Sequence, residues 1–278
     1  MRHQKGALRA EVMRYIVLLA FLGGMFYPIL FMLLTTGKTN AELSINFFGF
    51  PQNIQVSNFT RAWDAVVPYI LNSVLVSGVS VAGVLALAVL SAYAFARFKF
   101  PAKNLLFYGI VALMMIPGIL TFVPQFLIAR DLGLLNTRLA LILPYIAGGQ
   151  VGAIFMLRIF FAGLPQELLE AARVDGANEF VVLFRLVVPL SIPMIMVIAV
   201  QNILGTWNDY IWPLVTIGMN ASIRTVPIGL AFLPTEYAQI PYGAVMAGYT
   251  ISAIPLAILF VFTMRYFVEG LSSGALKL

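Results

Sequence analysis

The stretch LPQELLEAARVDGANEFVVLFRLVVPLSIP, residues 164–193, carries six charged side chains in a chain that is only 10% charged. Long uncharged runs lie on either side of it, so we interpret it as a water-exposed loop between membrane spans. Its sequence predicts a helix, a break and a second helix. Pro165 suits the first helical position, because its missing N–H would be unpaired there. Gly176 can take the left-handed conformation that ends a helix.

The two predicted helices carry further local signals. Glu167 stands in the first turn, where the helix dipole favours negative charge, and Asn178 can cap the second helix. Small residues at Ala171 and Ala172, on the surface of the first helix, would allow close approach to a partner's groove. Each feature taken singly is equally explained by a solvated loop of good helix formers. The second helix is predicted from apolar residues at helical spacing: Phe180, Leu183, Phe184 and Val187.

The spacing within this loop matches a known pattern. Glu170-Ala171-Ala172 is followed after three residues by Gly176, and after nine more by Leu186-Val187-Val188-Pro189. This resembles the EAA loop of permease subunits in bacterial ABC importers, whose pattern ends in Ile-x-Leu-Pro, so two aliphatic positions differ. The resemblance extends along most of the chain. It is greatest to the second permease subunit of maltose-type carbohydrate importers.

Composition places the chain in lipid. Hydrophobic residues make up 61% of its 278 residues and charged residues only 10%. A soluble domain typically has about 25% charged residues. The chain has no cysteine and one histidine, His3, in the polar N-terminal tail, so we expect no disulfide, no thiol catalysis and no metal site. Gly37-Lys38-Thr39 resembles the end of a phosphate-binding loop, but Met32 stands where that motif needs glycine. We expect the chain to bind neither ATP nor nucleic acid.

The fold class is expected to be an all-α membrane protein with six transmembrane helices. A span needs about 20 apolar residues. The first run is longer than the core of a signal peptide and is expected to be a retained helix. Proline is expected to break the third run at Pro117 and Pro124. The six runs are Tyr15–Thr36, Ala65–Ala96, Asn104–Ala129, Leu139–Leu157, Leu186–Asn208 and Tyr237–Met264.

Two further segments are predicted not to span. The run Tyr210–Ile223 is apolar but short, and we interpret it as interfacial or re-entrant. The segment Lys38–Asp64 is polar and aromatic, and we interpret it as an interfacial cap over the bundle. The chain then divides into a tail (1–14), the first helix with its external loop (15–64), a permease core (65–267, with the EAA loop at 164–193) and a C-terminal tail (268–278).

Basic residues predict the orientation. Of the 17 Lys and Arg residues, twelve fall in the termini, in the segment between the second and third spans, and in or just before the loop 164–193. Cytoplasmic segments carry an excess of Lys and Arg. Both termini and the loop 164–193 are therefore expected in the cytoplasm of a bacterial cell, with the chain in its inner or plasma membrane.

Neutral polar residues within the spans have two open interpretations. Amides could line a passage for a neutral, hydroxyl-rich solute, or they could form hydrogen bonds between helices, worth about 0.6–2 kcal/mol each. The glycines at 78, 83, 148, 149 and 152 are expected to allow close helix packing rather than to mark a site. The residues predicted for a substrate pathway are Gln125, Gln150, Asn202, Asn208 and Asp209, with Asn72, Ser73 and Gln201 as further polar residues in the spans.

The resemblance implies the partners and the mechanism. They are a homologous second permease subunit, two ATPase subunits that hold ATP and Mg²⁺, and an external solute-binding protein, importing a sugar or sugar derivative by alternating access. A C-terminal tail contact with the ATPases is implied for Ser272, Ser273 and Gly274, although the chain ends Lys277-Leu278 where relatives often end Lys-Gly. The implied ATPase-docking residues are Glu167, Glu170, Ala171, Ala172, Asp175 and Gly176.

Two other classes remain open at this point. An ion-coupled carrier needs a titrating group near the membrane midplane, and the six uncharged runs contain none. Such a carrier would also need paired broken helices, for which Pro117 and Pro124 against Pro189 and Pro193 are a faint indication. A non-transporting membrane scaffold would leave the organised loop 164–193 without a role.

Overall fold

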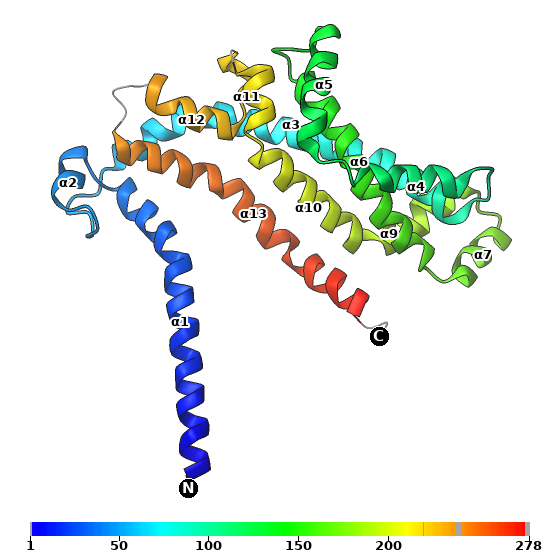
Figure 1. Ribbon diagram of the computed structural model, residues 1–278, viewed down its shortest axis with the longest axis horizontal. Coiled ribbons are helices and arrows are strands. Elements are labelled where there is room, and N and C mark those ends of the chain that lie inside the picture. The colour runs from blue at the N-terminus through cyan, green and yellow to red at the C-terminus, as the bar shows by residue number, and fades with distance from the viewer. Residues whose placement is uncertain (1, 219, 237–240, 276–278) are drawn as a thin grey trace. The chain divides into compact units, whose positions relative to one another are not determined.

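The computed structural model describes the backbone of residues 2–218, 220–236 and 241–275, and the side chains of residues 11–218, 220–234 and 241–266. Within this part of the chain every regular element is helical (Figure 1). The elements are α1 (Arg2–Thr36), α2 (Asn40–Ile45), α3 (Val56–Arg97), α4 (Lys103–Leu113), α5 (Gly118–Asp131), α6 (Leu139–Ala162), α7 (Gln166–Val174), α8 (Glu179–Val182), a π-helical segment (Leu183–Val187), α9 (Val188–Leu190), α10 (Ile192–Asn208), α11 (Ile211–Ile217), a 3₁₀ turn (Ala221–Ile223), α12 (Val226–Glu236) and α13 (Tyr242–Ala275).

The helices confirm the all-α membrane class. Four are long and apolar enough to cross a membrane, and the number rises to six if each of two bent helix pairs counts as one span. The pair α4 and α5 is bent by 98°, and the pair from Glu179 to Asn208 by 76°. The four single helices are Glu11–Thr36, Val56–Arg97, Leu139–Ala162 and Tyr242–Tyr266.

The third predicted span is broken at one proline and not at the other. The chain turns between Leu113 and Gly118, where Pro117 precedes α5 with an extended ψ of 129°. Pro124 lies inside α5 without ending it, so the predicted break at Pro124 is wrong. Proline has no N–H to donate, and its ring clashes with the preceding turn of a helix. It therefore interrupts a helix unless neighbouring groups compensate for the lost hydrogen bond and the clash is relieved.

The fifth predicted span starts later than expected. Its straight part, α10, begins at Ile192 rather than at Leu186, because the chain bends at Ser191. Residues 183–187 form the π-helical segment, in which the hydrogen-bonded turn is one residue wider than in an α-helix. The predicted second helix of the loop 164–193 therefore exists, but it has three parts.

Other predicted boundaries also shift. The second span begins as helix at Val56, so the C-terminal part of the predicted cap Lys38–Asp64 belongs to α3. The fourth continues to Ala162. The sixth begins at Tyr242, and the predicted start at Tyr237 lies outside the described residues. Helix α12, Val226–Glu236, was not among the predicted elements, because its run of apolar residues around Pro234 is too short to span.

The described chain forms two compact units: residues 1–67 with 230–254, and residues 68–229 with 255–278. In the first unit the cap is held by buried polar groups. The Lys38 ammonium is fully buried and donates to the carbonyl oxygens of Asn46 (2.8 Å) and Phe47 (3.0 Å). The Asn58 amide donates to the carbonyl oxygens of Thr36 (2.8 Å) and Lys38 (3.0 Å). The turn after α1 is thereby fixed by hydrogen bonds, and none of the ion pairs found among the described residues lies in it.

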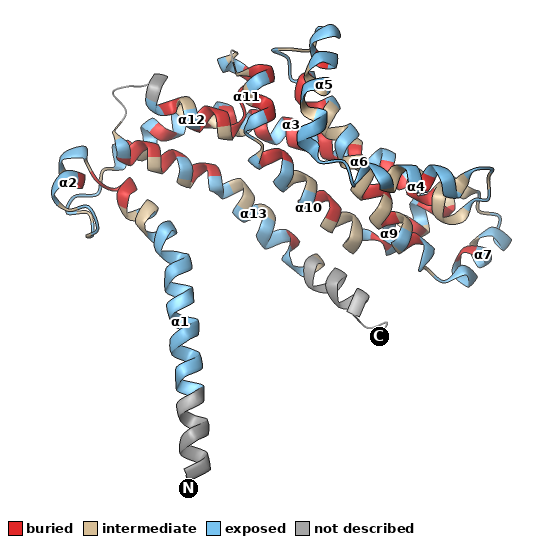
Figure 2. Cartoon of the chain, in the orientation of Figure 1, coloured by how far each residue is buried: buried red, intermediate tan, exposed pale blue. Residues whose placement is uncertain are grey.

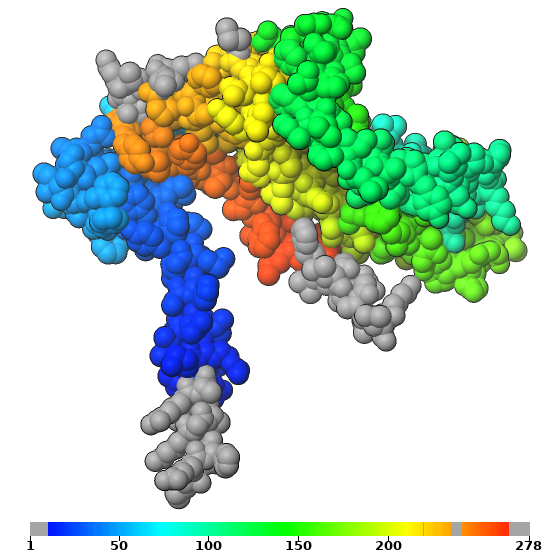
Figure 3. All heavy atoms as spheres, in the orientation of Figure 1, coloured from blue at the N-terminus to red at the C-terminus, as the bar shows by residue number. Residues whose placement is uncertain are grey.

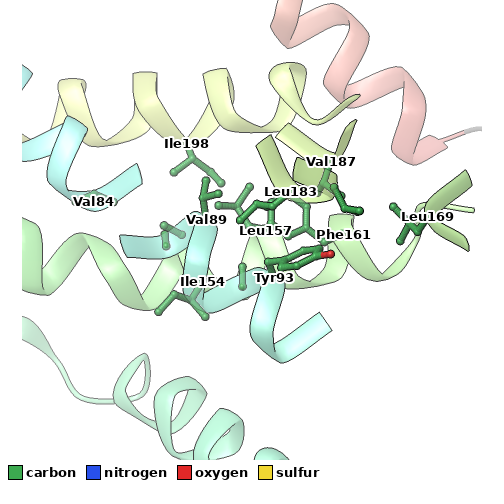
Figure 4. Close-up of a cluster of buried hydrophobic side chains, with 14 residues drawn as sticks. Val84, Val89, Tyr93, Ile154, Leu157, Phe161, Leu169, Leu183, Val187 and Ile198 are labelled. Atoms are coloured by element: carbon green, nitrogen blue, oxygen red, sulfur yellow. The ribbon is translucent and has the colours of Figure 1, made fainter. Parts of the chain in front are cut away.

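The second unit contains a hydrophobic cluster that joins α3, α6 and the loop 164–193. Figure 4 shows Tyr93 of α3 and Phe161 of α6 beside Leu183 and Val187 of the π-helical segment. Leu169 of α7 also belongs to the cluster and is 1% exposed. In Figure 2 these buried positions alternate with exposed ones along α6 and α10. The loop is therefore anchored in the bundle by apolar side chains from both of its helices.

Much of the surface of the second unit is apolar, as expected of helices that face lipid or another membrane subunit. Along α4 and α5, Leu105 is 75% exposed, Ile119 74% and Leu120 66%. The space-filling view shows the side chains of these two helices, in green, on the face toward the viewer (Figure 3). A water-exposed surface of this composition would be rare in a soluble protein.

Candidate functional site

The first candidate site is the helical loop, residues 164–182. Its helix α7 begins after Pro165, which takes the N-cap position with φ −56° and ψ 130° rather than the predicted first helical position. Glu167 lies in the first turn as predicted. The helix ends at Gly176 with a φ of +85°, which confirms the predicted left-handed conformation.

The hydrogen bonds after α7 explain the glycine. The N–H of Ala177 donates to the carbonyl of Ala172, and the N–H of Gly176 donates to that of Arg173, both at 3.0 Å. This is the Schellman motif, which satisfies the last carbonyls of a helix and needs a left-handed residue at the glycine position. Asn178 then caps α8, because its side-chain oxygen accepts from the N–H of Val181 at 3.0 Å. The predicted cap is confirmed.

A charged pair closes the turn and ties it to α3. Arg173 Nε donates to Glu179 Oε1 at 2.8 Å, and Arg173 also donates to Oε2 at 3.3 Å. The hydrogen bond that Arg173 donates to the Glu179 carboxylate raises the pKa of Arg173 above its ordinary value. The Tyr93 hydroxyl donates to Glu179 Oε2 at 2.6 Å. One carboxylate therefore connects α7, α8 and α3.

The start of the loop is tied to α3 as well. Arg97, one turn after Tyr93, donates to the carbonyl of Leu164 at 2.8 Å and to that of Phe161. A guanidinium that holds the free carbonyls at a helix end is favourable both as a hydrogen bond and for the helix dipole. Both ends of the loop thus contact the last turn of the same long helix.

The docking residues predicted from the sequence do not all face outward. Ala172 is half-buried and packs against the hydrophobic cluster, so its predicted position on the helix surface is wrong. The Glu170 carboxylate accepts a hydrogen bond from the Gln166 side chain at 2.7 Å. The residues on the exposed side of the loop are Glu167, Glu170, Ala171, Asp175 and Gly176.

The second candidate site is a cavity of about 490 Å³ in the second unit, between α5, α6, α10 and α11. Its polar lining is almost entirely neutral, and small residues form much of the wall. Among the predicted pathway residues, Gln125, Asn202 and Asp209 line it, whereas Gln150 and Asn208 do not. The lining residues are Gly118, Thr121, Phe122, Gln125, Pro144, Tyr145, Gly148, Gly149, Gly152, Ala153, Gln201, Asn202, Gly205, Thr206, Asp209 and Trp212.

Asp209 is positioned by two hydrogen bonds. It follows the last residue of α10, its Oδ2 accepts from the Tyr145 hydroxyl at 2.8 Å, and its Oδ1 accepts from the N–H of Trp212 at 3.3 Å. Trp212 is buried and its indole N–H donates to the carbonyl of Ala140 at 2.9 Å. Trp212 is therefore fixed inside the protein by this hydrogen bond.

The other polar residues of the spans make structural hydrogen bonds. The Gln150 amide donates to the carbonyl of Val84 at 3.2 Å, and that of Asn208 to Leu204 in its own helix at 2.8 Å. Asn72 donates to the carbonyls of Ser222 (2.9 Å) and Arg224 (3.1 Å), so it holds the turn before α12. For Gln150 and Asn72 the geometry favours the second interpretation, hydrogen bonding between elements, whereas the bond of Asn208 stays within α10.

Sequence reasoning missed Tyr145 and the role of the glycines. The expectation of close packing is right for Gly149, where an added Cβ would lie 2.5 Å from Asn202 Oδ1, and for Gly83, where it would lie 2.5 Å from Ile146. It is wrong for Gly148 and Gly152, where an added Cβ would meet nothing within 4 Å and which line the cavity. Their spacing of four residues along one face of a predicted span was the available signal.

The C-terminal contact and the expected absence of a metal site both stay predictions. Ser272, Ser273 and Gly274 lie in the last turns of α13, where side chains are outside the described residues, so their predicted contact stays a prediction. Among the described residues, no group of three or more His, Cys, Asp and Glu side chains lies close enough together to hold a metal ion.

A bundle of membrane helices, a polar cavity among them and a rigid helical loop with an exposed face together define a subunit of a membrane transporter. Residues 84–273 match the family described as binding-protein-dependent transport system inner membrane component, and the chain belongs to this family. It is therefore a multi-pass permease subunit in the inner membrane, a transport component rather than an enzyme, which works with an ATPase and a solute-binding protein.

Individual relatives cover nearly the whole chain. It is 32% identical over 268 residues to the probable ABC transporter permease protein YurM of Bacillus subtilis, covering 96% of this chain and 89% of that protein. It is 34% identical over 257 residues to the arabinooligosaccharides transport system permease protein AraQ of Halalkalibacterium halodurans, covering 90% and 91%. The fold is similar, with a TM-score of 0.81 and 23% identity, to a crystal structure of a bacterial ABC transporter involved in the import of the acidic polysaccharide alginate, covering 92% of this chain and 96% of that one.

Proposed function

We propose that this chain carries a sugar or sugar derivative into the cytoplasm as one of two homologous permease subunits. Two ATPase subunits would bind ATP and Mg²⁺, and an external solute-binding protein would deliver the solute. The carbohydrate relatives support the solute class, and one of them is named for arabinooligosaccharides. The neutral amides of the cavity suit a hydroxyl-rich solute.

The observation that carries this proposal is the geometry of the loop 164–182. Its Schellman turn at Gly176 fixes the angle between α7 and α8. Its exposed side presents Ala171 between carboxylates, and its buried side is anchored by Leu169 in the cluster that contains α3 and α6. A rigid exposed helix anchored in the bundle is suited to transmit a push from a partner to the spans.

The mechanism follows from those contacts. Closure of the ATPases would displace α7, and the displacement would pass through Glu179 to Tyr93 and through Arg97 to the end of α6. Packed interfaces switch between discrete arrangements rather than deforming continuously. The bundle would then alternate between states open to the inside and to the outside, and hydrolysis would reset it.

The docking surface is tested with two variants of the loop. Gly176→Val forces a β-branched residue to a positive φ, a strain of about 1–3 kcal/mol, although an added Cβ would clash with nothing within 4 Å. Ala171→Glu adds bulk and charge on the exposed side. We expect both permease chains to assemble normally, while ATP hydrolysis stimulated by the binding protein falls about tenfold, as for a loss of about 1.4 kcal/mol.

The matched control is Gly176→Asn, since asparagine tolerates the left-handed conformation better than other residues. It should retain most of the stimulated hydrolysis. If Gly176→Val and Ala171→Glu both retain full stimulated hydrolysis and full uptake, this loop is not the docking element.

Orientation is tested separately, by cysteines introduced into a chain that has none. Val174 is 88% exposed in the loop, and Ser57 is exposed at the start of α3. An impermeant maleimide should label Ser57→Cys in intact cells and Val174→Cys only after permeabilisation. Labelling in the opposite order would reverse the proposed orientation, in which both termini are cytoplasmic.

A further inference from the structure

The cavity between α5, α6, α10 and α11 has an asymmetric charge. Asp209 is the single charged side chain among the described residues that line it. Its carboxylate is half-buried and accepts from the Tyr145 hydroxyl and the Trp212 N–H, both neutral donors. Among the described residues, no Lys or Arg lies within ion-pair distance of it. The cavity therefore has a negative charge that no neighbouring cation balances.

The neutral groups around Asp209 have hydrogen-bonding capacity to spare. The side chains of Gln125 and Gln201 line the cavity and make no hydrogen bond to the described part of the chain. Each amide offers two N–H donors and a carbonyl acceptor. The Asn202 amide donates to its own helix at Ile198, 2.9 Å away, which leaves its oxygen free of any partner among the described residues. This donor and acceptor set can serve hydroxyl groups, which both donate and accept.

The width of the cavity is kept by glycine. Gly118 of α5, Gly148 and Gly152 of α6 and Gly205 of α10 all line it, and an added Cβ at any of them would meet nothing within 4 Å. None of the four is required for close helix packing. They leave backbone exposed in the cavity wall, which also contains the edge-to-face pair of Phe122 and Trp212, whose ring centroids lie 5.5 Å apart.

We propose that this cavity is a solute subsite in this chain, which accepts uncharged, hydroxyl-rich sugars and rejects anionic ones through Asp209. The inference deepens the proposed function and rests on it. Flat apolar surface with a few convergent polar groups is the usual make-up of a small-molecule site. A sugar carboxylate or sulfonate would meet the Asp209 carboxylate in a partly desolvated space, where like charges repel more strongly than in water.

The subsite also gives this chain a selectivity that its fold alone does not determine. The solved transporter of similar fold is involved in the import of the acidic polysaccharide alginate. The same bundle can therefore serve acidic solutes, and the lining of the cavity, not the arrangement of helices, would decide the charge preference.

Binding is measured on the assembled permease–ATPase complex in lipid nanodiscs, without the binding protein, so that its own selectivity does not intervene. The probes are maltotriose, which is neutral, and trigalacturonate, which has the same number of rings and three carboxylates. We expect the complex to bind maltotriose at least about tenfold more tightly than trigalacturonate, and Asp209→Asn, which keeps an acceptor for Tyr145, to reduce that ratio about tenfold. Asp64→Asn is the matched control, because Asp64 is exposed and is not part of the cavity lining, and it should retain the ratio.

Filling the cavity tests its location. Gly152→Leu places a side chain in the open space and should abolish maltotriose binding. Gly109→Leu is the matched control, because Gly109 lies in α4, away from the cavity lining, and also has nothing within 4 Å of an added Cβ. It should bind maltotriose as the unaltered complex does.

The outcomes separate the subsite from the proposed function. If Gly152→Leu binds maltotriose as well as Gly109→Leu does, or if Asp209→Asn leaves the ratio unchanged, the subsite is wrong. The proposed function would then still stand, provided that the unaltered complex hydrolyses ATP and imports sugar when the binding protein is added. If that unaltered complex imports no sugar, the proposed function itself fails.

Discussion

The loop 164–182 and the cavity are both near α6, yet different kinds of residue determine them. In the loop, side chains fix each turn: Asn178 caps α8, and Arg173 and Glu179 close the turn after α7. In the cavity, the decisive positions, such as Gly148 and Gly152, have no side chain at all. A docking element needs one rigid shape, whereas a solute passage needs room, and the two regions differ accordingly.

The largest expected effect is on the anchoring of the loop. Leu169 is 1% exposed within the cluster of α3 and α6, so Leu169→Ala should destabilise the chain by about 2–5 kcal/mol. Leu168→Ala is the matched control, because Leu168 is 47% exposed. Thermal denaturation of the purified complex measures the difference. Equal melting temperatures for the two variants would mean that the loop is not anchored through Leu169.

The next effect contrasts two adjacent glycines in the cavity wall. At Gly149 an added Cβ would lie 2.5 Å from Asn202 Oδ1 and 2.6 Å from a methyl group of Val84, whereas at Gly148 it would meet nothing within 4 Å. Gly149→Val should therefore cost about 1–3 kcal/mol through overpacking. Gly148→Val should leave the fold intact. Assembly with the second permease subunit and thermal stability are the measurements, and a greater loss for Gly148→Val would contradict the packing described for α6.

An effect of comparable size is expected where α3 holds the loop. Tyr93→Phe removes the hydroxyl that donates to Glu179, and a hydrogen bond to a charged group is worth about 1.5–3 kcal/mol. Hydrogen exchange of the amides in residues 173–182 should accelerate, since local opening becomes easier. Tyr108→Phe is the control, because Tyr108 is 67% exposed and its hydroxyl has no hydrogen bond to the described residues. Unchanged exchange in Tyr93→Phe would show that Glu179 is held without α3.

The smallest effect concerns the cap of α8. Asn178→Ala removes the acceptor for the N–H of Val181 and should cost about 1 kcal/mol. Exchange of the amides of α8 should accelerate by about fivefold, while Asn104→Ala, in the exposed first turn of α4, should leave α8 unchanged. If both variants behave alike, the loop does not depend on this cap.

Local signals explain why the loop was predictable. A glycine four residues before a run of helical spacing, with an asparagine between, specifies a turn through groups that lie within a few residues of one another. Ala172 was misplaced because its burial depends on contacts with α3 and α6, which the loop's own sequence does not contain.

The cavity depends on such distant contacts throughout. It lies between four helices, and one of these, α5, begins directly after the bend at Pro117. The described helices contain other prolines, among them Pro28, Pro124 and Pro144, that do not interrupt them. Packing decides which proline bends the chain, and the sequence does not show that packing. Three of the polar residues that line the cavity could therefore be predicted from the sequence, but the space that they surround could not.

The burial of Lys38 determines how this chain responds to amine-reactive reagents. Its ammonium group is fully buried against the carbonyls of Asn46 and Phe47, so a reagent in solution cannot reach it. On the proposed orientation it is the one lysine on the outer side. A succinimidyl ester that cannot cross the membrane would leave this chain unmodified in intact cells, although the same ester would tag it in opened cells. Amine tagging of this chain is thus a measure of membrane integrity. The four lysines on the cytoplasmic side are Lys5, Lys99, Lys103 and Lys277.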